Sequence, residues 1–294
     1  MKLYQRAVIR ELDKKYNFHR NKSLGQNFIA DESILAAIVE GAQLTEDDLV
    51  VEIGPGFGVL TAEICQYAGR VVAVELDKNL IPILSATLAE EGNVEIVHDD
   101  ILKVDLPTLI REQKQRFPEV KNVKIIGNLP YYITTPIIMT LLKNSLPVET
   151  ITVMMQKEVA ERVRAKAGSK TYGVLSLSVQ YYCNVHSVVQ VPKAAFVPPP
   201  KVDSEVLRLE LRQEKPVDVI NEDRFFACIK AGFHSRRKTL ANCLSGFCGV
   251  SKEDASAIME SVGIAPGRRA ETLDMEEFAA LANGFEKRID ICQK

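Results

Sequence analysis

The chain has little of what marks a secreted, membrane-bound or zinc-binding protein. No apolar run approaches the roughly 18 uninterrupted residues of a membrane helix, and the charged segment 1–10 is unlike the apolar core of a signal peptide. The six cysteines are scattered, without a CxxC pair or a neighbouring cluster of histidines. We therefore expect buried or incidental thiols, no disulfide framework and no metal site. These absences predict a cytoplasmic protein that has no membrane partner.

An excess of positive charge is also missing, because the formal net charge is -2 over 294 residues. Such a balance gives no reason by itself to expect a nucleic-acid partner. The basic residues are nevertheless concentrated, with seven Lys and Arg against two acids in residues 1–30 and four against none in residues 225–245. Patches of this kind favour contact with RNA or DNA phosphates, although they also occur on ordinary solvated surfaces.

Short β-branched runs alternate with amphipathic segments from about residue 30 to residue 160. This alternation is typical of a parallel sheet with helices on both faces. Helices are expected to begin at Asp31, at Asp77, and at Thr135 with Pro136 in the first turn. Strands are expected at 49–53, 70–74, 94–97, 123–126 and 150–155.

The alternation then stops. Segments 185–191 and 206–211 are expected to form an antiparallel hairpin around the proline-rich loop 192–201, and the chain beyond a polar connection at 213–222 has a helical pattern. We therefore predict an α/β domain over residues 1–215, including the basic N-terminal arm, and a small all-α domain over residues 216–294.

A glycine-rich turn, EIGPGFG at residues 52–58, follows the first predicted strand. Its glycines let the backbone turn tightly and approach a ligand that lies across the strand ends. A dinucleotide fingerprint would place its third glycine at position 59, which is Val59, so NAD and FAD are disfavoured. The turn, which includes Gly54 and Gly56, suits a nucleoside with a short zwitterionic tail such as S-adenosylmethionine. A purely structural turn would look the same.

Three later strand ends carry polar side chains that can complete such a site. Glu75 can accept hydrogen bonds from both ribose hydroxyls, and Asp100 can accept one from an adenine amine. Asn128 begins the tetrapeptide Asn-Leu-Pro-Tyr, whose side-chain and backbone oxygens can hold an exocyclic amine while Tyr131 offers a stacking face. Each residue alone is equally compatible with a cap or a turn. Together they predict a methyltransferase, because open α/β sheets bind ligands along this edge.

Five stretches of the chain match motifs of one known family. They are NKSLGQNFI at 21–29, EIGPGFG at 52–58, NLPY at 128–131, FVPPPKVDS at 196–204 and AGFHSRRKTL at 231–240. In these stretches the chain resembles the small-subunit ribosomal RNA adenine dimethyltransferases, the KsgA family, from about residue 10 to residue 282. The resemblance implies a class I S-adenosylmethionine-dependent methyltransferase, Rossmann-like with a seven-stranded and mostly parallel sheet. Erm-type enzymes resemble the chain less around 231–240 and 266–271.

The resemblance also implies roles for individual residues. Tyr131 and Phe196 are expected to flank the target adenine, while the side-chain oxygen of Asn128 and the carbonyl of Leu129 accept hydrogen bonds from N6. S-adenosylmethionine is expected to contact Asn27, Ile29, Gly54, Glu75, Asp100 and Asn128, to which the glycine turn adds Gly56. Apart from the resemblance, the concentrated basic charge makes Lys22, Arg236, Arg237 and Lys238 the candidates for contact with RNA phosphates.

The implied reaction moves the sulfonium methyl to N6 of adenine and repeats to give N6,N6-dimethyladenine. The expected substrate is a pair of adjacent adenines in a hairpin near the 3′ end of 16S ribosomal RNA, in an immature 30S subunit, and the expected enzyme is a monomer. Two alternatives stay open. One is an Erm-like methyltransferase acting on 23S ribosomal RNA, and the other is a ribosome-assembly factor that binds without chemistry.

Overall fold

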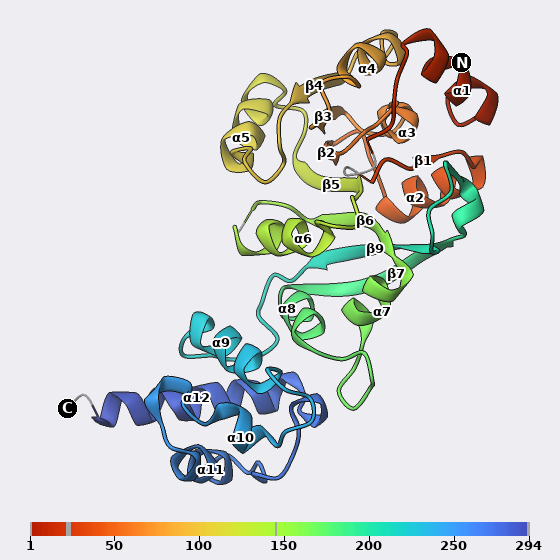
Figure 1. Cartoon of the computed structure of the whole chain (residues 1–294). Coiled ribbons are helices and arrows are strands. Elements are labelled where there is room, and N and C mark those ends of the chain that lie inside the picture. The colour runs from red at the N-terminus through yellow and green to blue at the C-terminus, as the bar shows by residue number, and fades with distance from the viewer. Residues whose placement is uncertain (1, 22–24, 145, 293–294) are drawn as a thin grey trace. The chain divides into compact units, whose positions relative to one another are not determined.

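The computed structural model describes residues 2–21, 25–144 and 146–292, the last four of these without their side chains (Figure 1). The chain forms two compact units. The first comprises Met1–Ala160 and Asn184–Leu211, and the second comprises Glu161–Cys183 and Arg212–Lys294. The division at residues 215 and 216 stays a prediction, and the second compact unit differs from it by taking in Glu161–Cys183.

A seven-stranded sheet forms the centre of the first unit, in the order β4-β3-β2-β5-β6-β9-β7. Strands β2 to β6 are parallel, and β9 is antiparallel to β6. The predicted seven-stranded, mostly parallel sheet is therefore confirmed, with β7 and β9 as neighbours. The strands are β2 (Asp48–Ile53), β3 (Arg70–Glu75), β4 (Val94–His98), β5 (Asn122–Asn128), β6 (Thr150–Gln156), β7 (Cys183–Val191) and β9 (Ser204–Leu211).

Helices precede and connect the strands of this unit. Asp31 caps α2 as predicted, because its Oδ1 accepts from the amides of Ser33 and Ile34 at 3.0 and 3.3 Å. The helices are α1 (Arg6–Lys15), α2 (Glu32–Ala42), α3 (Val59–Cys65), α4 (Ile81–Thr87), α5 (Leu106–Arg116) and α6 (Thr134–Lys143), and α7 (Lys157–Arg164) crosses the division between the units.

The other two predicted helix starts are wrong. Asp77 does not cap α4, because its Oδ1 accepts from the amide of Asn79 in the turn before the helix, and Leu80 occupies the N-cap. Thr135 is the second residue of α6 rather than its cap. Pro136 still lies in the first turn, where its missing N–H costs no helical hydrogen bond.

A second, two-stranded sheet joins distant parts of the first unit. Strand β1 (Phe28–Ile29) pairs antiparallel with β8 (Phe196–Val197), placing Ile29 opposite Phe196. The Phe28 ring also stacks on Phe57 of the glycine turn, with ring centroids 4.1 Å apart. The proline-rich loop and the N-terminal motif therefore lie side by side. This pairing could not be predicted, because strands of two residues leave no recognisable pattern in the sequence.

The second unit is helical, and after Leu211 the described chain forms only helices and turns, as predicted. Its core contains the fully buried rings of Phe225, Phe278 and Phe285. Among the described residues, no helix is both long enough and apolar enough to cross a membrane. The longer helices are α8 (Val174–Tyr182), α9 (Glu222–Gly232), α11 (Lys252–Ser261) and α12 (Met275–Cys292), with the short α10 (Leu240–Leu244) between α9 and α11.

Candidate functional site

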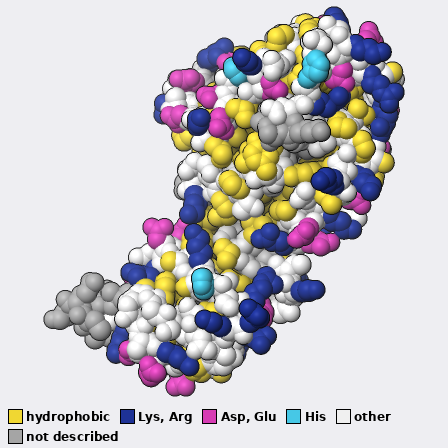
Figure 2. Space-filling view, viewed as in Figure 1, with side chains coloured by type: hydrophobic (Ala, Val, Ile, Leu, Met, Phe, Trp, Pro, Cys, Tyr) yellow, Lys and Arg dark blue, Asp and Glu magenta, His cyan; other side chains and the backbone are white. Residues whose placement is uncertain are grey.

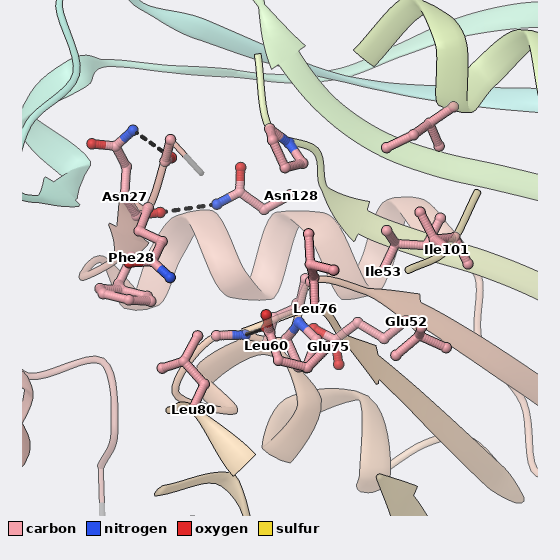
Figure 3. Close-up of a pocket in the computed structure, with 18 of the residues that line it drawn as sticks. Asn27, Phe28, Glu52, Ile53, Leu60, Glu75, Leu76, Leu80, Ile101 and Asn128 are labelled. Carbon is pink, nitrogen blue, oxygen red and sulfur yellow. Dashed lines mark hydrogen bonds between the residues drawn. The ribbon is translucent and has the colours of Figure 1, made fainter. Parts of the chain in front are cut away.

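A pocket opens where the carboxyl ends of β2, β3 and β5 meet the segment 25–29 (Figure 3). Its lining encloses an open hollow, the concave kind of surface at which proteins bind small molecules. The structure brings every residue predicted to contact the cofactor to this one lining. They are Asn27, Ile29, Gly54, Gly56, Glu75, Asp100 and Asn128.

The glycine turn forms one wall of the pocket. Gly54 and Gly56 have φ angles of +68° and +62°, which residues with a Cβ adopt only with strain. A Cβ at Gly56 would also lie 2.8 Å from the Phe28 ring. Glycine is therefore needed at these positions for the conformation of the turn. At Gly56 it is also needed because the Phe28 ring packs closely against the backbone.

Glu75 lies at the end of β3 with its carboxylate held in place. Its Oε2 accepts from the amide of Gly56 at 3.2 Å, and its Oε1 accepts from the amide of Asp77 at 2.8 Å. Burial raises the pKa of Glu75, and these amides oppose that shift. Each carboxylate oxygen retains a lone pair for another donor, so the group can receive a pair of hydroxyls.

Asp100 follows β4 at the same edge. Its Oδ1 accepts from the amide of Leu102 at 3.1 Å, and its Oδ2 lies 3.9 Å from the Lys103 ammonium. The side chain thus stabilises its own turn, as a cap would. It lines the pocket at the same time, where its remaining lone pairs can accept from a ligand amine.

Asn128 ends β5 and faces the segment 25–29. Its Nδ2 donates to the carbonyl of Asn27 at 3.0 Å, and Asn27 in turn donates through its own Nδ2 to the carbonyl of Gly25 at 3.0 Å. Figure 3 shows the side-chain oxygen of Asn128 turned away from Asn27. The amide is therefore oriented with its donor engaged and its acceptor facing elsewhere.

The other predicted acceptor residues do not contribute to this lining. Phe196 is fully buried, because β8 pairs with β1 and carries its ring into the core. The Leu129 side chain is buried as well, and the Tyr131 hydroxyl is hydrogen-bonded to Ser204 Oγ at 2.7 Å. Tyr132, with 55% of its surface exposed, lines the pocket in their place.

Glu52, on β2, is a pocket residue whose importance the sequence did not reveal. It is fully buried, and its Oε2 has no hydrogen-bond partner among the described residues. Burial raises its pKa to about 8; nearby Thr61 opposes that shift and the charge of Glu75 adds to it. The residue opens the glycine motif, but only the structure shows that its carboxyl group is removed from water.

The pKa of Glu52 predicts a measurable pH dependence of folding. Between its ordinary value of 4.5 and about 8, the folded protein holds a proton that the unfolded chain releases. The free energy of unfolding therefore falls as pH rises through this window, by about 1.4 kcal/mol per pH unit for this group. Glu52→Gln should remove that contribution, which urea midpoints of both proteins between pH 5 and 8 will measure. Identical slopes for the two proteins would contradict the assignment.

The candidate RNA contacts lie elsewhere. Arg236, Arg237 and Lys238 are exposed residues between α9 and α10 of the second unit, whose visible face carries many Lys and Arg side chains (Figure 2). Arg236 donates to the carbonyls of Lys170 and Tyr172 at 2.5 and 2.8 Å, so its guanidinium also holds the local chain. Lys22 lies outside the described residues. Among the residues described, no group of three or more His, Cys, Asp or Glu could hold a metal ion.

Comparisons with known proteins identify relatives of this chain. A sequence model of the family described as "Ribosomal RNA adenine dimethylase" matches residues 17–287. A protein of Clostridioides difficile named "Ribosomal RNA small subunit methyltransferase A" is 47% identical over 98% of both chains, and one of the same name from Oceanobacillus iheyensis is 50% identical over 92% of both.

Two solved structures extend the likeness to the fold. A dimethyladenosine transferase from Plasmodium falciparum has a TM-score of 0.75 at 26% identity, covering 89% of this chain and 98% of its own. The 23S rRNA methyltransferase ErmE has a TM-score of 0.68 at 25% identity, covering 88% and 100%. Because the family model spans most of the sequence and the relatives align over nearly their whole length, this chain belongs to the ribosomal RNA adenine dimethylase family.

Proposed function

We propose that this protein transfers methyl groups from S-adenosylmethionine to N6 of adenines in small-subunit ribosomal RNA. The observation that carries the proposal is the pocket in which the glycine turn, Glu75, Asp100 and Asn128 meet. Family membership and the name of the relatives support the reaction and the subunit. More specifically, the proposed target is a pair of adjacent adenines near the 3′ end of 16S RNA. They are dimethylated in an immature 30S subunit in the cytoplasm.

The pocket residues fit S-adenosylmethionine in charge and in hydrogen bonding. Glu75 would hold the ribose hydroxyls and Asp100 the adenine amine, with the glycine turn beneath the nucleoside. Glu52 lines the same pocket, and its buried Oε2 has no hydrogen-bond partner among the described residues, so its carboxyl group can bond to a polar group of the ligand. The cofactor supplies a methyl group bonded to a positively charged sulfur, and the carbon of this methyl group is already a strong electrophile.

The protein's task is then to present the acceptor nitrogen. The lone pair of an adenine amine is delocalised into the ring, so N6 is a poor nucleophile until it becomes pyramidal. Hydrogen bonds from N6 to Asn128 Oδ1 and to the carbonyl of Leu129 favour that shape and aim the lone pair. The bond from Asn128 to the Asn27 carbonyl keeps the acceptor oxygen in place. Such positioning supplies part of the roughly 7–11 kcal/mol available to proximity and orientation.

No general base is required by this arrangement, because the methylated ammonium is acidic enough to lose its proton to water. After the first methylation, N6 carries a methyl group and one remaining N–H. The uncharged side-chain amide of Asn128 accommodates this bulkier amine better than a carboxylate would. Tyr131 and Phe196 are proposed to flank the adenine ring. For Phe196, contact with a base requires the β1–β8 segment to move, since its ring is fully buried here.

RNA contacts must offset the few kcal/mol needed to take the target base out of its stack. We assign this role to Lys22 in the N-terminal arm and to Arg236, Arg237 and Lys238 in the second unit. They would act on phosphates, so binding should weaken as salt increases. The enzyme is proposed to act as a monomer.

The substrate assignment can be tested with one panel of acceptors. Labelled S-adenosylmethionine is supplied with small subunits lacking the modification, with large subunits and with protein-free 16S RNA. We expect label in the small subunits, at least about tenfold above the other two. Label mainly in large subunits would instead favour an Erm-like enzyme, and subunit binding without label would favour an assembly factor. Either of these results would contradict the proposal.

A further inference from the structure

Gln26 links the segment 25–29 to the turn that follows β3. Its Nε2 donates to Asp77 Oδ2 at 2.7 Å, and its Oε1 accepts from the amide of Asn21 at 2.7 Å. Both ends of the side-chain amide are thus engaged, which fixes its orientation. The Asp77 carboxylate is largely buried and receives this bond away from bulk water, where a charge-assisted hydrogen bond is strong.

Asp77 connects this link to the proposed ribose site. Its backbone amide donates to Glu75 Oε1 at 2.8 Å, while Glu75 Oε2 receives the amide of Gly56. Gln26 is therefore two hydrogen bonds away from the carboxylate that would hold the cofactor. Since Asp77 contacts Glu75 through its backbone, altering the Asp77 side chain leaves that second bond available.

The residue after Gln26 reaches the acceptor side of the pocket. The carbonyl of Asn27 receives Asn128 Nδ2 at 3.0 Å and so determines which way the Asn128 oxygen points. Further along, the segment is fixed by the pairing of β1 with β8, where the amide of Ala30 donates to the carbonyl of Ala195 at 2.7 Å. Among the described side chains of the segment 25–29, Gln26 is the one that hydrogen-bonds to the turn after β3, next to the proposed ribose site.

We propose that Gln26 is a positioning residue, which holds the Asn27 carbonyl so that Asn128 presents its oxygen to N6 above the cofactor bound at Glu75. This inference rests on the proposed function and deepens it. The bond from Gln26 to Asp77 sets the spacing between the two halves of the site. Breaking it should slow methyl transfer more than it weakens cofactor binding.

The test uses the full-length protein and small subunits lacking the modification. Gln26→Glu places a carboxylate against that of Asp77, so the single-turnover rate should fall about 10- to 100-fold, as expected for misplaced reacting groups. The dissociation constant for S-adenosylmethionine should change by less than about threefold. Adding Asp77→Asn restores a donor opposite the new carboxylate and should return the rate to within about threefold of the wild type.

Two further variants separate positioning from a general structural role. Gln66→Glu makes the same change at a surface pair, where Gln66 Nε2 donates to Glu91 Oε2 at 3.3 Å outside the pocket, and should leave the rate unchanged. Gln26→Ala removes the bond without adding charge and should slow transfer about tenfold. It serves as the decisive variant if Gln26→Glu does not fold.

Equal rates in the wild type and Gln26→Ala would overturn the role of Gln26 while leaving the proposed function intact. Gln26→Glu could also lose cofactor affinity in parallel with rate, without recovery when Asp77→Asn is added. That result would show that Gln26 has a structural role and not a positioning one. Absence of label with the wild type itself would overturn the proposed function and this inference together.

Discussion

Replacing Asn128 by alanine is expected to slow methyl transfer about a thousandfold, equivalent to about 4 kcal/mol in the activation barrier. The variant loses the oxygen that is proposed to shape and aim N6, while among the described residues it loses one partly buried hydrogen bond, to the Asn27 carbonyl. Its folding should therefore suffer by only about 1 kcal/mol. Single-turnover rates with labelled S-adenosylmethionine and immature small subunits measure the first effect, and urea unfolding measures the second.

Asn128→Asp provides the matched control for this prediction. Aspartate retains an acceptor oxygen but cannot donate to the carbonyl of Asn27, and its charge opposes that carbonyl. We expect a rate between those of the wild type and Asn128→Ala. A rate for Asn128→Ala within tenfold of the wild type would show that the amine is held by other groups.

Glu75→Gln is expected to weaken S-adenosylmethionine binding about a hundredfold. The carboxylate holds two backbone amides and is proposed to receive two ribose hydroxyls. A neutral amide of the same shape keeps one acceptor oxygen and turns an NH2 group toward one of the buried amides. The loss of charge-assisted bonds, about 1.5–3 kcal/mol each, supports a change of this size. Isothermal calorimetry with the cofactor alone gives the dissociation constant directly.

Glu95→Gln is the matched control for Glu75→Gln. Glu95, on the neighbouring strand β4, accepts from Arg70 at 2.6 Å and from Gln113 at 3.1 Å, and it does not line the pocket. This variant should be less stable than the wild type yet bind the cofactor normally. If Glu75→Gln bound S-adenosylmethionine within threefold of the wild type, the ribose assignment would be wrong.

The parallel strands were predictable because their signal is local. Strands β2, β3 and β6 are buried almost throughout, so they occur in the sequence as runs rich in apolar, β-branched residues. Once the strand order of an open α/β sheet is expected, the residues after each strand must share an edge. The gathering of Gly54, Glu75 and Asn128 in one pocket follows from that geometry rather than from any contact visible in the sequence.

Long-range side-chain contacts were not predictable in the same way. The bond between Gln26 and Asp77 spans 51 residues, and nothing in either neighbourhood indicates its partner. Strands β1 and β8 are two residues long and too short for periodicity to show. The burial of Phe196 depends on that pairing. The motif at 196–204 therefore suggested that Phe196 contacts the target adenine, but it gave no sign that the ring lies in the core. Glu52 was part of a predicted motif, yet the desolvation of its carboxyl group depends on the complete fold.

The identity of the product tests the central claim most directly. Small subunits lacking the modification are incubated with the wild-type protein and S-adenosylmethionine, and the RNA is digested to nucleosides for mass spectrometry. The arrangement around Asn128 predicts that N6,N6-dimethyladenosine accumulates at the expense of N6-methyladenosine. Methylated cytidine, or N6-methyladenosine as the final product, would contradict it.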